Sequence, residues 1–147
     1  MWTNAKTDWK STDFYNISDY ERIRDNILWI KQLADSVVDK DTVIAKTYTY
    51  NVPTLTNMAD KEYSDITYAS VLNTVENNFA LINANTHEIA DERNTFESNG
   101  AFYSHIQLNE LEEMIQLLHD WLLWDMSGMR KTGFTLANSI SQKGVLL

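Results

Sequence analysis

Residues 104–127 carry the feature that most limits how this chain can fold, a helical pattern with apolar residues on two adjacent rows. One row contains Leu111, Ile115, Leu118 and Leu122, and the other contains Met114, Leu117, Trp121 and Trp124. Residues three or four apart share a face of a helix, and the second row is turned from the first by roughly 100°. A helix that is apolar over so much of its circumference is either central to its domain or shared between subunits. Gly128 is its expected C-terminal stop.

Two earlier segments show a narrower helical pattern, with apolar residues repeating at steps of three and four. In the first, Ser18 and Glu21 have the spacing of a capping box, so we expect this helix to begin at Ser18 and to run to about Val38. The second helix is expected from about Tyr68 to Asn83. The apolar stripe of the first consists of Tyr20, Ile23, Ile27, Ile30, Ala34 and Val37, widened by Leu28 and Leu33, and that of the second of Leu72, Val75, Phe79 and Ile82.

The segments outside these helices complete the predicted architecture. Residues 39–60 contain two short runs of β-favouring residues, and we interpret this stretch as a long loop or a short β-hairpin. A chain of 147 residues in which 44% are apolar fits one domain. We therefore predict a mainly α fold, a single helical domain over residues 1–147. It is a small three-helix bundle with an irregular or β-hairpin insertion and extended N-terminal (1–17) and C-terminal (129–147) arms.

The charge balance of the chain is acidic, with 12 Lys and Arg residues against 21 Asp and Glu residues and a formal net charge of −9. This balance disfavours binding to a nucleic-acid backbone or to an anionic membrane. The absence of cysteine excludes disulfide bonds, thiolate nucleophiles and cysteine-ligated metals. The first residues are too polar for a signal peptide, and no apolar run approaches the ~20 residues that cross a bilayer. We expect a soluble protein whose partners include neither nucleic acid nor membrane.

Residues with catalytic or metal-binding chemistry form no recognisable motif. The three histidines lack the spacing of a metal site, and the nearest approach to one is His87 with Asp91 at positions i and i+4. Adjacent acids such as Glu112 and Glu113 point to different faces of a helix, so we interpret them as a solvated surface. No nucleophile elbow, phosphate-binding loop or dinucleotide fingerprint is present. We therefore predict no metal, no cofactor and no enzymatic activity.

Two of the five tryptophans, Trp2 and Trp9, lie in a polar segment that precedes the first predicted helix. An aromatic side chain in such a segment needs a surface to cover it, either another element of the chain or another subunit. A stacking or sugar-binding platform is the alternative role for the tryptophans. We assign the first apolar row of residues 104–127 to the intrachain core and the second row to a contact with another subunit. The predicted interface residues are Trp2, Trp9, Met114, Leu117, Trp121 and Trp124.

Charge is unevenly distributed along the second half of the chain. Residues 83–125 carry nine acids and one base, Arg93, whereas residues 126–147 carry Arg130, Lys131 and Lys143 and no acid. Opposite charges on neighbouring segments favour their association. The basic tail therefore docks on the acidic helix of its own chain or of a neighbouring copy, or else it is solvated.

The start of the first predicted helix is similar to the start of the second at an offset of 52 residues. Residues 20–27 match residues 72–79 in type and spacing, including Asn26 against Asn78. Residues 108–112, with the sequence LNELE, form a third and weaker copy. The similarity indicates either an internal repeat or the chance likeness of amphipathic helices with polar first turns. Three irregular copies are too few for a solenoid.

Residues 9–27 resemble the opening of small structural proteins of tailed phages and prophages. In those proteins a Trp, an Asp-aromatic pair, a loop and a helix of the pattern D-hydrophobic-N-R-I-E-x-N open a tail-associated or baseplate-associated module. The corresponding residues here are Trp9, the pair Asp13-Phe14 and the helical sequence DYERIRDN of residues 19–26. Residues 63–82 are similar to the same pattern. Glu21 replaces the Asn of the pattern in the first copy, and Thr74 replaces the Arg in the second.

The resemblance implies a non-enzymatic virion component, either a building block of the tail tip or an attachment element for a receptor-binding protein. Such a protein is found in the virion tail, or in the host cytoplasm before assembly. We expect it to self-associate, as a trimer or hexamer, and to dock on other phage structural proteins. Two alternatives remain. One is an acidic inhibitor that presents carboxylates as a nucleic-acid mimic to a host protein, and the other is an enzyme of unknown class.

Overall fold

The computed structural model of the chain describes residues 1–37, 39–41, 46–89 and 94–126. Its elements, in chain order, are α1 (Ile17–Ser36), β1 (Asp39–Asp41), β2 (Lys46–Tyr48), α2 (Ala69–Ala84) and α3 (His105–Met126). The mainly α fold with three packed helices is confirmed, and β1 and β2 pair antiparallel as the hairpin of the expected insertion. Gly128, the basic tail and the C-terminal arm (129–147) lie outside the described residues.

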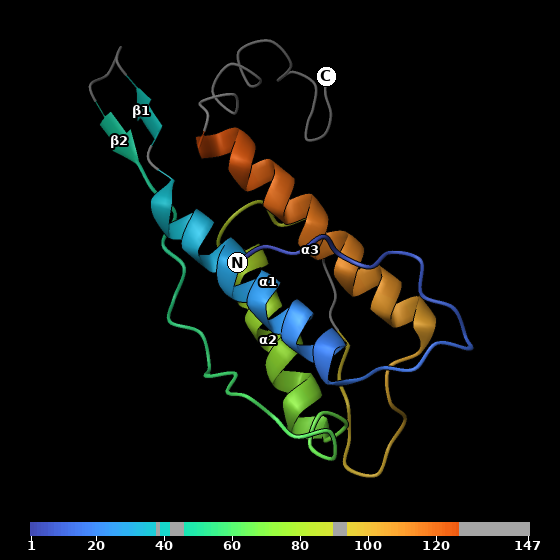
Figure 1. The fold of residues 1–147 in the computed structure, drawn as a ribbon. Helices are drawn as coiled ribbons and strands as arrows, with labels where there is room; N and C mark the ends of the chain where they lie inside the picture. Colours follow the sequence, from blue (N-terminus) through green and yellow to red (C-terminus); the bar gives the residue numbers. More distant parts are fainter. Residues whose placement is uncertain (38, 42–45, 90–93, 127–147) are drawn as a thin grey trace.

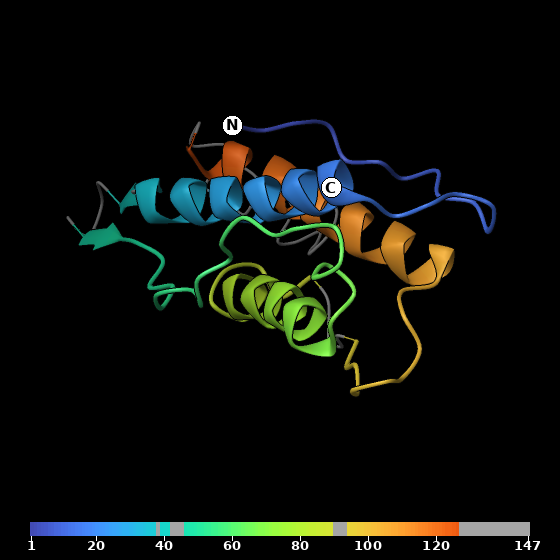
Figure 2. The ribbon, with the colours of Figure 1, turned by 60° about the horizontal axis from the view of Figure 1, so that its bottom comes forward.

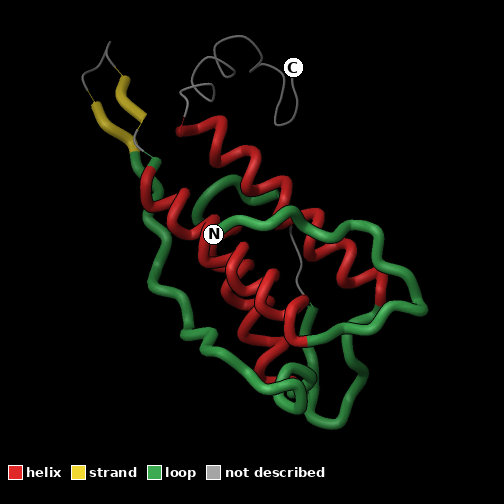
Figure 3. Tube along the Cα trace, in the orientation of Figure 1, coloured by secondary structure: helices red, strands yellow, loops and turns green. Residues whose placement is uncertain are grey.

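All three helices run in the same direction, as the views in Figures 1 and 2 both show. Neighbouring helices joined by short loops run antiparallel, so parallel neighbours need long returns. The returns here are residues 37–68, which include the hairpin, and residues 85–104 (Figure 3). α1 packs against both α3 and α2, which makes α1 rather than α3 the central helix of the domain.

The apolar stripes expected from the sequence form the core. The α1 and α2 stripes are buried, and so is the first row of α3, Leu111, Ile115, Leu118 and Leu122. Leu33 widens the α1 stripe as expected, but Leu28 does not, because its side chain is exposed. Met58, Ile66, Phe96 and Tyr103 come from the segments between the helices, and Tyr15 comes from the segment before α1; all five are part of the core. The return segments therefore belong to the folded domain.

The start of α1 differs from the sequence prediction. The N-cap is Asn16, whose side-chain oxygen accepts hydrogen bonds from the backbone N–H groups of Ser18 (2.9 Å) and Asp19 (3.3 Å). The Asp19 carboxylate accepts in return from the Asn16 N–H (3.0 Å), which completes a capping box. The predicted box of Ser18 and Glu21 was wrong, because Asn caps as well as Ser and Asp19 closes the box at the same spacing. The Ser18 hydroxyl instead donates to the Asn16 side chain (2.6 Å).

Candidate interaction site

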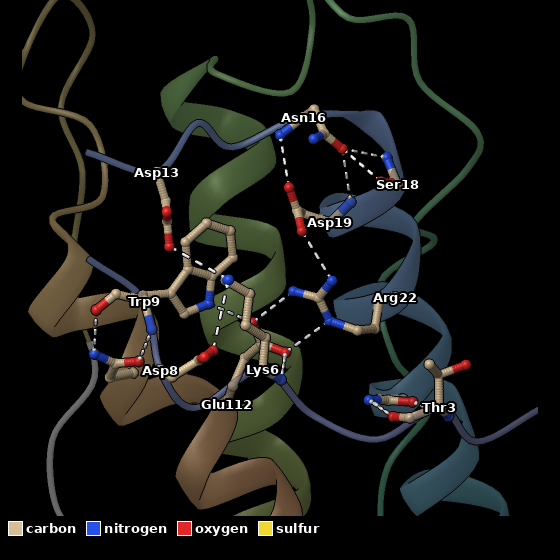
Figure 4. Close-up of polar contacts among 12 residues, drawn as sticks. Thr3, Lys6, Asp8, Trp9, Asp13, Asn16, Ser18, Asp19, Arg22 and Glu112 are labelled. Carbon is tan, nitrogen blue, oxygen red and sulfur yellow. Dashed lines mark hydrogen bonds and ion pairs between the residues drawn. The ribbon is translucent and has the colours of Figure 1, made fainter. Parts of the chain in front are cut away.

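Residues 1–9 lie along α1 and α3 and are held there by side chains of both helices (Figure 4). The Thr3 N–H donates to Asn26 Oδ1 (3.0 Å), and Asn26 Nδ2 donates to the Thr3 carbonyl (2.7 Å). The Trp9 N–H donates to Asn109 Oδ1 (2.8 Å), and Asn109 Nδ2 donates to the Trp9 carbonyl (3.0 Å). Each asparagine thus satisfies both backbone groups of one residue, as a neighbouring strand would. We call this arrangement an asparagine clamp.

Glu112 of α3 binds the same segment from a buried position, with 1% of the residue exposed. Its carboxylate accepts from the Lys6 N–H (2.9 Å) and from the indole Nε1 of Trp9 (2.7 Å). Arg22 of α1 donates to both of its oxygens, from Nε (2.9 Å) and from the terminal nitrogen Nη2 (2.7 Å). A paired guanidinium offsets the cost of burying a carboxylate. The expected solvated surface at Glu112 and Glu113 is therefore wrong for Glu112.

Arg22 is the cation at the centre of this group of contacts. It also donates to Asp19 Oδ1 (2.8 Å), so two carboxylates share its charge. Burial acts to lower the pKa of Arg22, but the hydrogen bonds and negative charge of Glu112, followed by those of Asp19, outweigh burial and raise it. The guanidinium therefore stays charged and fixes α1, α3 and the N-terminal segment in one arrangement.

The same contacts recur on α2. The Phe96 N–H donates to Asn73 Oδ1 (2.8 Å), and Asn73 Nδ2 donates to the Phe96 carbonyl (2.8 Å). Glu76 is buried and accepts from the Asn94 N–H (2.9 Å) and from the Tyr103 hydroxyl (2.5 Å). Asn73 and Glu76 have the same positions in α2 that Asn109 and Glu112 have in α3.

The matched asparagines of the first and second helices are also equivalent in structure. Asn26 clamps Thr3, and Asn78 clamps Thr56 by two hydrogen bonds of 2.9 and 2.8 Å. Each therefore holds the segment that precedes its own helix, while Asn73 and Asn109 hold the segment that precedes another helix. These repeated contacts favour an internal repeat over a chance likeness of the sequences.

The structure covers the two N-terminal tryptophans with other parts of the same chain. Trp9 has 4% of its surface exposed and packs beside Tyr15, with 6.2 Å between the ring centroids. Trp2 is partly buried and stacks on His119 of α3, with 3.8 Å between ring centroids and an interplanar angle of 8°. The assignment of Trp9 to a subunit interface is therefore corrected, because its side chain lies in the core of its own chain.

The second apolar row of α3 is not uniform in exposure. Met114 and Trp121 are partly buried, and the Trp121 ring meets the His87 ring edge to face, with 4.9 Å between centroids. Leu117 has 37% of its surface exposed and Trp124 has 60%. Leu123 and Met126 are also exposed, but around the helix they lie about 100–120° and about 160–180° away from Leu117 and Trp124. The apolar residues exposed on one side of the C-terminal half of α3 are therefore Leu117 and Trp124, and we call this pair the α3 outer face.

A second polar cluster, at the end of α3, has no counterpart in the sequence predictions. Asp125 Oδ2 lies 2.7 Å from His87 Nε2 and accepts from the Tyr50 hydroxyl (2.6 Å). The Asp125 side chain is buried, and Tyr50 and His87 come from the two return segments. His87 therefore pairs with a residue far away in the sequence, whereas Asp91, its expected neighbour, lies outside the described residues. The cluster fastens the end of α3 to both returns.

Within residues 1–37, 39–41, 46–89 and 94–126, no three His, Asp or Glu side chains are grouped to hold a metal ion. A hollow of about 510 Å³ lies between the start of α2 and residues 96–101. Glu97 is the one carboxylate among its lining residues, and no histidine, lysine or arginine lines it.

Comparisons with known protein families, with curated proteins and with solved structures found no match for this chain. Among the helices that the structure describes, none combines the length and the hydropathy needed to cross a membrane. Two features of the structure bear on function, the clamped N-terminal segment and the α3 outer face.

Proposed function

We propose that this chain is a non-enzymatic structural component of a phage or prophage particle, associated with the tail or baseplate. It acts by self-assembly and by docking to other structural proteins of the particle. The resemblance of residues 9–27 to such proteins supports the assignment to a particle. The observation that carries the assembly role is the α3 outer face, where Leu117 and Trp124 are exposed on the same side of α3 although the domain has a buried core of its own.

The composition of the α3 outer face fits a contact between proteins. Tryptophan is among the residues that contribute most to binding between proteins. Asp120 and Glu113 are exposed on the same side of α3, within about 60° of Leu117 and Trp124 around the helix, so acidic and apolar side chains share this surface. The apolar side chains provide affinity, and the neighbouring acids provide specificity.

The assembly role is tested by light scattering on the chain and on two single variants. We expect a homo-oligomer, a trimer or hexamer, and we expect Trp124→Ser to weaken association by tenfold or more while the monomer stays folded. Ile106→Ser is the matched control, because Ile106 and Trp124 both have 60% of their surface exposed and lie at opposite ends of α3. A mass of 17.0 kDa at high concentration contradicts the proposal.

The two apolar rows of α3 face different directions, so substitutions in them should change the free energy of unfolding by different amounts. Leu118 belongs to the buried row, and Leu118→Ala should lower the free energy of unfolding by roughly 2–5 kcal/mol. Trp124→Ser should lower that free energy by less, because most of the Trp124 surface is exposed. If Trp124→Ser unfolds the chain, the second row belongs to the core of the monomer. Mass spectrometry of purified particles, which detects the chain and its copy number, tests the assignment to a virion.

The acidic-inhibitor alternative receives no support from the positions of the carboxylates. A nucleic-acid mimic needs acids on one exposed face at the spacing of phosphates, whereas Glu76, Glu112 and Asp125 are buried and hydrogen-bonded inside the domain. We therefore propose the structural role alone.

A further inference from the structure

The groove between α1 and α3 that holds residues 2–9 is built to recognise an extended peptide. We call this site the arm groove and define it by its polar side chains, which are Arg22, Asn26, Asn109, Glu112 and His119. Asn26 and Asn109 hydrogen-bond to the backbone of the segment near its two ends. His119 stacks on the indole at one end, and Glu112 accepts from the indole at the other. We infer that the arm groove also accepts residues 2–9 of a second copy of this chain, so that copies exchange these segments. This inference rests on the self-association part of the proposed function.

The contacts of the arm groove do not depend on which copy supplies the segment. The connecting residues 10–14 form an exposed turn, in which the Asp13 N–H donates to the Lys10 carbonyl (3.0 Å), and Phe14 has 85% of its surface exposed. Two ionic contacts, Lys6 with Asp8 (3.6 Å) and Lys6 with Asp13 (3.3 Å), lie within the N-terminal residues and leave α1 and α3 untouched. Exchange therefore preserves the buried contacts. In the closed form each segment binds its own chain, and a higher local concentration of copies shifts the equilibrium toward the form in which the segments are exchanged.

The position of the segment in the chain makes exchange feasible here and not at the other clamps. Residues 94–96, which Asn73 and Glu76 hold, join α2 to α3, and Thr56, which Asn78 holds, lies between α1 and α2. Releasing either segment pulls on two packed helices. Of the helices that the structure describes, none precedes residues 2–9, so release of this segment pulls on α1 alone.

A peptide experiment on the full chain tests the inference. A synthetic peptide of residues 1–12, labelled with a fluorophore at its C-terminus, is titrated with the chain and followed by anisotropy. Because a short connection gives the chain's own segment an effective concentration on the order of 1 mM, we expect saturable binding with half-saturation near that concentration. A peptide carrying Trp9→Ala lacks the indole donor to Glu112 and should bind at least tenfold more weakly.

The protein variants supply a matched pair of controls. Trp9→Ala in the chain weakens the competing segment and leaves the arm groove intact, so the unmodified peptide should reach half-saturation at an about tenfold lower concentration, whereas Asn73→Ala removes the equivalent clamp on α2 and should leave peptide binding unchanged. No binding at several times the effective concentration, or equal binding of the Trp9→Ala peptide, overturns the inference. An oligomer that Trp124→Ser disrupts, together with absent peptide binding, leaves the proposed function intact and rejects segment exchange alone.

Discussion

The clamps on α2 and α3 use the same two residue types at the same helix positions, yet they hold different parts of the chain. Asn73 and Glu76 hold residues 94–96, which lie close by in the sequence, whereas Asn109 and Glu112 hold the segment that ends at Trp9. Glu112 faces a guanidinium and an indole, and Glu76 accepts from a phenol and a backbone N–H. The helix position thus sets the geometry of the clamp, while the donors that satisfy its buried carboxylate differ between copies.

The largest effect we expect from breaking one copy is that of Glu112→Gln. The substitution removes the charge that pairs with Arg22 in the interior, and breaking such a pair costs about 3–5 kcal/mol. Glu76→Gln alters a buried carboxylate that accepts from the Tyr103 hydroxyl and the Asn94 N–H, and it should cost at least roughly 1–3 kcal/mol. Urea unfolding of the two variants measures both values.

Glu113→Gln is the control for this pair. Glu113 is the exposed neighbour of Glu112, and its substitution should change the free energy of unfolding by no more than about 0.5 kcal/mol. A loss for Glu112→Gln no larger than that for Glu113→Gln contradicts the structural role of the buried pair of Glu112 with Arg22.

Substituting the clamp asparagines should cost less unfolding free energy, and each substitution should loosen only its own clamp. Asn109→Ala and Asn73→Ala each leave one backbone N–H and one carbonyl without their side-chain partner, at a cost of about 2 kcal/mol. Amide hydrogen exchange should rise at Trp9 in the first variant and at Phe96 in the second. Faster exchange at both residues in either variant shows that the two clamps open together rather than as independent copies.

The helices and the core rows were predictable from the sequence because their signal is local. Residues three or four apart in α3 form the buried row of Leu111 to Leu122 whatever the rest of the chain does. The clamps were not predictable in the same way, because Asn109 and Trp9 lie at opposite ends of the chain and no local pattern relates them. The available signal was the repeat of LNTVE in LNELE, which placed an Asn and a Glu at equivalent positions but did not name their partners.

The parallel direction of the helices was also not predictable from local patterns in the sequence. Residues 37–68 and 85–104 show no strong periodicity, and the sequence predicted only a loop or hairpin over residues 39–60. Met58 and Phe96 are buried where helix side chains bind the backbone: the Tyr20 hydroxyl donates to the Ala59 carbonyl, and Asn73 makes two hydrogen bonds with Phe96. A cap signal was misassigned for the opposite reason, since Asn16 and Ser18 both offer local caps and only the folded chain selects between them.

The smallest expected effect concerns the phenol of Tyr103, which donates to Glu76 of α2. Burial, and then the negative charge of Glu76, raise the pKa of Tyr103 well above its ordinary value of 10.0. Below about pH 10 the phenol is neutral in both states, so its full contribution to stability is present. Above that pH the unfolded chain releases the proton and the folded chain keeps it, so stability falls by up to about 1.4 kcal/mol per pH unit for this residue.

Tyr103→Phe tests this pH dependence. Tyr15 and Tyr20 also have pKa values raised by burial, so the unmodified chain loses stability above about pH 10 through all three residues. The variant loses the hydrogen bond to Glu76 at every pH, and the informative quantity is therefore the slope of unfolding free energy between about pH 9 and about pH 11. That slope should be shallower in Tyr103→Phe, because one of the three tyrosines with a raised pKa no longer contributes to it. An unchanged slope means that Tyr103 ionises in the folded chain, and it would remove the phenol as the feature that separates the α2 clamp from the α3 clamp.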